Sequence, residues 1–73
     1  MKLIGTIDKP EHKGFVAKIY DNREWGEFVV KYLEGSLLLP EVTWTHTSDK
    51  QDAFDTANSE LSHLARNKGN KRG

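Results

Sequence analysis

The sequence predicts an α+β fold: a four-stranded antiparallel sheet followed by one C-terminal helix packed on one face, in the order β-β-β-β-α. Three observations predict it. Residues 1–47 contain runs that alternate with the period of half-buried strands, residues 49–67 repeat with the period of a helix, and the first connections are short. We expect residues 1–67 to form this single domain and residues 68–73 to form a disordered basic tail.

The first three strands are expected at residues 2–8, 15–20 and 28–33. In the first strand, Leu3 shares one face with the glycine and isoleucine that follow at alternate positions, whereas Ile4 lies on the other face. Proline and glycine in the first connection, and a polar segment ending in glycine in the second, are typical of turns. Short turns make these strands antiparallel neighbours.

A fourth strand is expected after Pro40, which cannot donate a ladder hydrogen bond and therefore indicates an edge, a bulge or a break. Its alternation predicts that Val42, Trp44 and His46 share one face, with Val42 and Trp44 turned toward the helix. The threonines at alternate positions then lie on the other face.

The helix is predicted to begin at a capping box formed by Ser48 and Gln51 and to end near residue 67. Its apolar residues fall within an arc of about 120°, which is the width of a face that packs on a sheet. These residues are Ala53, Phe54, Ala57, Leu61, Leu64 and Ala65.

The charge of the chain is unevenly distributed. Residues 1–65 contain seven basic and eleven acidic side chains, a net charge of −4, whereas the end of the chain has basic side chains only. The four basic residues there are Arg66, Lys68, Lys71 and Arg72. Such a tail is either a solvated end or an arm for nucleic acid or an acidic partner.

The sequence argues against an enzyme and predicts no catalytic, cofactor-binding or metal-binding residues. Its serines lie in a turn, at the helix start or on the helix surface, with no nucleophile motif around them. The three histidines match no metal-ligand spacing, and there is no cysteine. With no apolar run near the ~20 residues that span a bilayer, we expect a cytoplasmic protein without a membrane or metal partner.

The most informative surface is the sheet face turned away from the helix. Apolar side chains among lysines and threonines suggest a contact surface on this face, although β propensity alone also places Val and Ile outside a sheet. The expected partner-binding residues are Lys18, Tyr20, Val29, Lys31 and Leu33.

Two functions are compatible with these residues. The first is a small non-enzymatic interaction protein that binds a protein partner, or itself as a weak homodimer, through the open sheet face. The alternative is a nucleic-acid-binding module that uses Lys18, Tyr20 and Lys31 together with the basic tail. The net negative charge of residues 1–65 favours the protein partner over nucleic acid.

Overall fold

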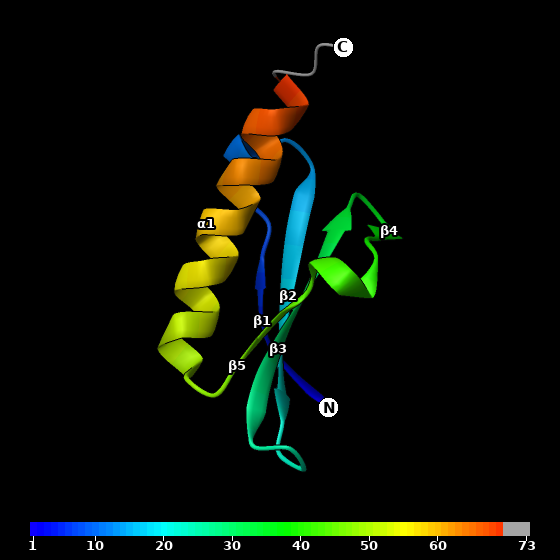
Figure 1. The fold of residues 1–73 in the computed structure, drawn as a ribbon. Coiled ribbons are helices and arrows are strands. Elements are labelled where there is room, and N and C mark those ends of the chain that lie inside the picture. Colours follow the sequence, from blue (N-terminus) through cyan, green and yellow to red (C-terminus); the bar gives the residue numbers. More distant parts are fainter. Residues whose placement is uncertain (70–73) are drawn as a thin grey trace.

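The computed structural model describes residues 1–69, and the basic residues Lys71 and Arg72 lie outside the described residues. The predicted α+β class, with an antiparallel sheet followed by one C-terminal helix, is confirmed (Figure 1). The elements are β1 (Lys2–Ile7), β2 (Phe15–Asn22), β3 (Glu27–Glu34), β4 (Leu37–Leu38), β5 (Thr45–Thr47) and α1 (Lys50–Gly69). Two 3₁₀ turns, η1 (Pro10–His12) and η2 (Glu41–Thr43), interrupt the connections.

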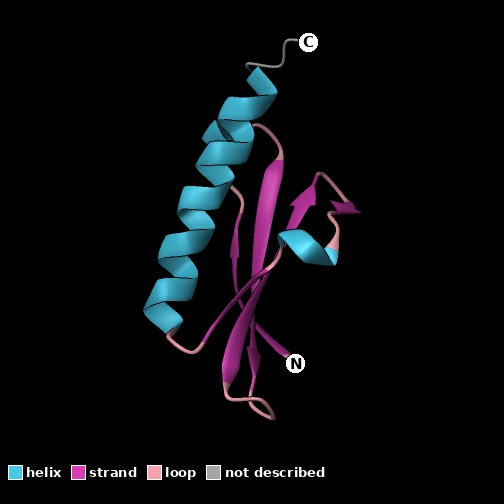
Figure 2. Cartoon of the chain, viewed as in Figure 1, coloured by secondary structure: helices cyan, strands magenta, loops and turns pink. Residues whose placement is uncertain are grey.

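The sheet is a meander in which β1, β2 and β3 pair in order, all antiparallel. Both β4 and β5 pair with β3, at opposite ends of the edge that β2 leaves open. The segment between them leaves the sheet through η2 and projects away from α1 (Figure 2). Leu37–Leu38, before the proline, thus form a short strand of their own, which makes a fifth strand in the sheet.

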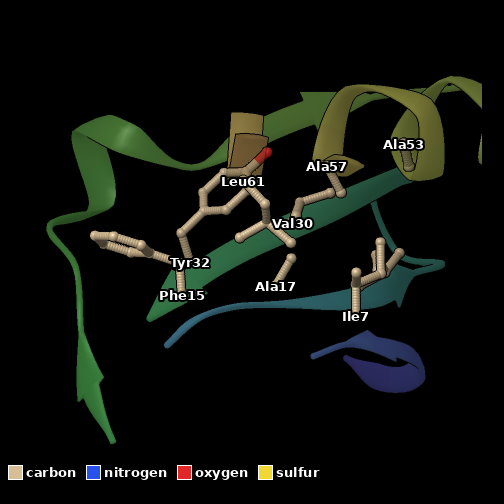
Figure 3. Packing of buried hydrophobic residues seen from close by; sticks show 9 residues of the cluster. Ile7, Phe15, Ala17, Val30, Tyr32, Ala53, Ala57 and Leu61 are labelled. Carbon is tan, nitrogen blue, oxygen red and sulfur yellow. The ribbon is translucent and has the colours of Figure 1, made fainter. Parts of the chain in front are cut away.

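The core lies between α1 and one face of the sheet, and Figure 3 shows strand side chains directed toward small residues of the helix. Tyr32, Ile19 and Leu61 are the largest fully buried side chains. Alanine at the helix positions nearest the sheet lets the two layers approach closely, so the aromatic side chains from β2 and β3 fill the remaining space. The buried members of this cluster are Ile7, Phe15, Ala17, Ile19, Val30, Tyr32, Ala53, Ala57 and Leu61.

The helix begins one residue later than the predicted capping box implies, with Lys50 as its first residue. Asp49 accepts a hydrogen bond from the Gln51 amide at 3.0 Å through its Oδ1 atom, which makes Asp49 the N-cap. The Gln51 side chain donates to Asp55 instead of reaching back to the cap. The predicted Ser48 cap was therefore wrong, because the Asp49 carboxylate one residue later accepts from the free Gln51 amide and also faces the positive end of the helix dipole.

The first strand contains a bulge that the alternation did not predict. Leu3 pairs with Tyr20 and Gly5 pairs with Ile19, so Ile4 is the extra residue on β1. Leu3 consequently lies on the face away from the helix, and Ile4 packs against the core cluster. The predicted faces of Leu3 and Ile4 were thus exchanged, whereas Ile7 lies in the core as expected.

The last strand has the opposite register from the prediction. Thr45 pairs with Val30 on the helix side, and His46 pairs with Val29 on the other side. The Thr45 hydroxyl lies 2.8 Å from the hydroxyl of the fully buried Tyr32, which needs a polar partner there. Because the helix side takes a hydroxyl at this position, Trp44 lies on the opposite face, over Lys31.

Burial raises the pKa of Tyr32 above its ordinary value of 10.0. The hydrogen bond with Thr45 lowers the pKa in part, and the negative charge of Glu60 raises it further. The folded protein therefore favours the neutral, protonated form of Tyr32.

The helix continues to Gly69, two residues beyond the predicted end, so Lys68 lies in its last turn and not in a disordered tail. The Lys68 ammonium is 3.3 Å from a carboxylate oxygen of Glu34 and 5.6 Å from the centre of the Phe15 ring. These contacts with β2 and β3 hold the last turn of α1 on the sheet. No helix among residues 1–69 is long and apolar enough to cross a membrane.

Candidate functional site

The candidate site is the sheet face opposite α1, which we call the open face. Strand pairing places its side chains: residues paired across neighbouring strands point to the same side. The open face consists of Leu3, Thr6, Val16, Lys18, Tyr20, Asn22, Glu27, Val29, Lys31, Leu33, Leu38 and His46, together with Trp44.

Two lysines face each other in the middle of the open face. Lys18 on β2 pairs directly with Lys31 on β3, and both side chains are half-buried. Like charges at directly opposed positions destabilise an antiparallel pair. The fold therefore tolerates a local electrostatic cost at the centre of this surface.

Two aromatic rings flank the second of these lysines. The Lys31 ammonium lies 4.8 Å from the centre of the Tyr20 ring and 4.7 Å from the centre of the Trp44 ring. Both distances are within the range of a cation–π contact, which contributes roughly 0.5–1 kcal/mol at an exposed site. The indole Nε1 of Trp44 also donates to the Leu39 carbonyl at 3.1 Å, which fixes the orientation of the ring.

The same face has a small packed centre of its own. Val29 is only 2% exposed although it points away from the helix, because Tyr20 and His46 lie at the paired positions on either side. At one end of the face, the Nδ1 atom of His46 lies 3.3 Å from a carboxylate oxygen of Glu27, and this contact orients the Glu27 side chain toward His46. The central side chains are therefore held in place before any partner binds.

One end of the open face is apolar. Val16, Leu33 and Leu38 follow one another across three strands. Leu37 of β4, which pairs with Glu34 on the helix side of the sheet, and Val42 of η2 are also exposed, Val42 with 89% of its surface accessible. The lysine and aromatic centre is thus continuous with the apolar area formed by Val16, Leu33 and Leu38.

All five residues predicted for partner binding lie on the open face. Arg66 and Lys68, which were predicted for nucleic-acid binding, do not lie on this face: they are at the end of α1, on the other side of the sheet. Sequence analysis missed Trp44. Pro40 was the signal that could have placed it. A proline often breaks a strand, so the alternation of the last strand should not have been extended back to Val42 and used to assign a face to Trp44.

Within residues 1–69 there is no group of three or more histidine, cysteine or acidic side chains that could hold a metal ion. The exposed Trp25 lies in the turn between β2 and β3, so it adds no ring to the lysine and aromatic centre.

Taken together, the fold and this surface define a small α+β protein with a helix on one side of an antiparallel sheet and an ordered, lysine-containing face on the other. No protein-family model, curated protein or solved structure matches the chain.

Proposed function

We propose that this protein is a non-enzymatic interaction module that binds an acidic region of a protein partner through the open face. The observation that carries the proposal is the direct pairing of Lys18 with Lys31. Two opposed cations cost stability in the isolated sheet, and carboxylates of a partner would relieve that cost.

The surrounding side chains support the same partner chemistry. The apolar residues Val16, Leu33 and Leu38 would contact aliphatic side chains beside the partner's carboxylates. Tyr20 and Trp44 keep Lys31 in one position, so little side-chain entropy is lost on binding. The described part of α1 exposes no large apolar side chain, so the helix offers no comparable apolar area.

Self-association through the same surface is disfavoured. A two-fold contact would place the Lys18 and Lys31 pair of one copy against the corresponding region of the other, and like charges across an interface are costly. The proposal is therefore for a different protein rather than a second copy.

Single-stranded nucleic acid is a second candidate, and the position of Trp44 specifically favours it. Tyr20 and Trp44 provide two rings on one sheet face beside two lysines, as in proteins that stack bases and neutralise phosphates. If only Lys18 and Lys31 contact phosphates, the affinity should depend weakly on salt, with a logarithmic slope of about −1.4.

The fluorescence of Trp44 can test both candidates. The chain has two tryptophans, so Trp25→Phe leaves Trp44 as the single reporter on the open face. In this background we would titrate a peptide of alternating glutamate and leucine, and separately oligothymidylate and oligouridylate, at low and moderate salt. The proposal expects a saturable change with the peptide, weakened by Lys18→Gln and by Lys31→Gln.

Lys50→Gln is the matched control, because Lys50 is exposed at the start of α1 and away from the open face. It should leave the affinity for the peptide unchanged. A saturable response to the oligonucleotides alone would replace the first candidate with the second. A silent Trp44 with every ligand, together with unchanged NMR shifts on the open face, would refute both.

A further inference from the structure

A shallow hollow of about 290 Å³ lies between η1 and the last third of α1. It is lined by Glu11, His12, Lys13, Ser62, Ala65 and Arg66. None of these residues belongs to the open face, so the hollow is independent of the function proposed above. Its size is at the lower limit for a small-molecule site.

The unusual group in the hollow is His12. Its side chain is only 3% exposed, and its Nδ1 atom is sealed from solvent without a hydrogen-bond partner among the described residues. Buried polar atoms in folded proteins nearly always have a partner, so an orphan one at the edge of a hollow calls for an explanation, and a bound ion or ligand is one. The ring lines the hollow, and its other nitrogen, Nε2, is not sealed in this way, so Nε2 is the atom that can donate to a ligand there.

The charges around the histidine indicate which ligand would complete it. Lys13 and Arg66 approach the hollow from η1 and α1 respectively, and neither forms an ion pair with another residue in the described part of the chain. Ser62 adds a hydroxyl donor from the helix. Two cations, a hydroxyl and an imidazole N–H suit the several oxygens and the double negative charge of a phosphate better than one carboxylate.

We propose that this hollow binds a phosphate group, either inorganic phosphate or a phosphate monoester. Arg66 and Lys13 neutralise the charge, while His12 and Ser62 donate hydrogen bonds. Glu11 is the one acid on the rim, and its negative charge limits the affinity.

The test is an NMR titration of the full chain with sodium phosphate at fixed pH, with sodium chloride keeping the ionic strength constant. We expect saturable shifts of the amides at residues 11–13 and 62–66. Glycerol phosphate reports on a monoester: equal affinity means that the phosphate alone is bound, and tighter binding means that the organic group also enters the hollow. Sulfate and acetate are the comparison anions.

Variants on the rim give predictions of opposite sign. Arg66→Gln removes a charged hydrogen-bond donor and should weaken phosphate binding about tenfold or more. Glu11→Gln should tighten it. Arg23→Gln makes the same chemical change in the distant turn between β2 and β3 and should leave binding unchanged.

His12→Phe separates binding from folding, because it fills the buried space and removes the orphan nitrogen. It should raise the unfolding midpoint and abolish the phosphate response. The proposal is overturned if no saturable shifts occur, if sulfate or acetate binds as tightly as phosphate, or if His12→Phe retains the affinity of the original chain.

Discussion

Replacing Lys18 with glutamine removes one of the two positive charges that oppose each other on the open face. This substitution should stabilise the fold while weakening the proposed binding of an acidic partner. Most surface substitutions change stability little. A gain in stability from Lys18→Gln would therefore show that the repulsion between the two lysines destabilises the fold at the centre of the candidate site.

The size of the effect follows from the contacts of each lysine. A directly opposed like-charge pair costs roughly 0.2–1 kcal/mol, so Lys18→Gln should raise the free energy of unfolding by about 0.5 kcal/mol. For a domain of this length, that gain corresponds to an increase of about 2–4 °C in the unfolding midpoint. Lys31→Gln removes the same repulsion but also loses contacts with two rings, so it should destabilise the fold by about 0.5 kcal/mol.

A double-mutant cycle isolates the repulsion. Chemical denaturation of the original chain, Lys18→Gln, Lys31→Gln and the double variant gives the four free energies of unfolding. In the Lys31→Gln background, Lys18→Gln should have no effect, and the coupling should shrink as salt is added. Lys50→Gln should change stability equally in both backgrounds, since it lies outside the sheet.

The reasoning is refuted if Lys18→Gln changes stability by the same amount whether or not Lys31 is present. It is also refuted if Lys18→Gln lowers the unfolding midpoint at low salt. Either result would show that the two ammonium groups do not repel each other, and the proposal of a negatively charged partner would lose the observation on which it rests.

Three other substitutions test the core and the helix start. Tyr32→Phe removes the hydrogen bond with Thr45 and should cost about 1 kcal/mol in urea unfolding at pH 7. Because the folded-state pKa of Tyr32 is raised, its contribution to the free energy of unfolding is complete below pH 10 and is lost as the pH rises through that raised pKa. Above about pH 10, the free energy of unfolding of the Tyr32→Phe variant should therefore fall less steeply with pH than that of the original chain. Gly5→Ala would place a Cβ 2.8 Å from the Phe54 ring, and calorimetry should show a loss of about 1–3 kcal/mol. Asp49→Ala removes the N-cap and should cost about 1 kcal/mol in the same assay.

The paired strands β2 and β3 are the part of the fold that the sequence predicts best. In each strand the core residues occupy every second position (Phe15, Ala17 and Ile19; Phe28, Val30 and Tyr32), and a one-residue slip would move them to the other face. That constraint correctly placed Lys18, Tyr20, Val29, Lys31 and Leu33 on the side away from the helix.

The faces of the outer strands were harder to predict because their registers depend on tertiary contacts. Leu3 and Ile4 are both apolar, so the pattern of apolar residues does not show which of them faces the helix or that Ile4 is an extra residue. Similarly, Thr45 lies on the helix side because the Tyr32 hydroxyl needs a partner there, a requirement set by a residue 13 positions away. Trp44 joined the open face as a result.

The burial of His12 was also beyond sequence reasoning. Its neighbours Glu11 and Lys13 are exposed, and the segment has the composition of an ordinary turn. Only the packing of η1 under the end of α1 covers the ring, and that packing depends on a helix that begins nearly 40 residues later.

The bulge in β1 also affects how copies of the protein behave at high concentration. β1 forms an edge of the sheet, and a flat edge strand exposes amide and carbonyl groups on which another chain can add a strand. The extra residue at Ile4 interrupts the regular spacing of those groups and increases the local twist. An incoming strand could therefore follow this edge for only two or three residues before losing register, which disfavours strand addition at β1.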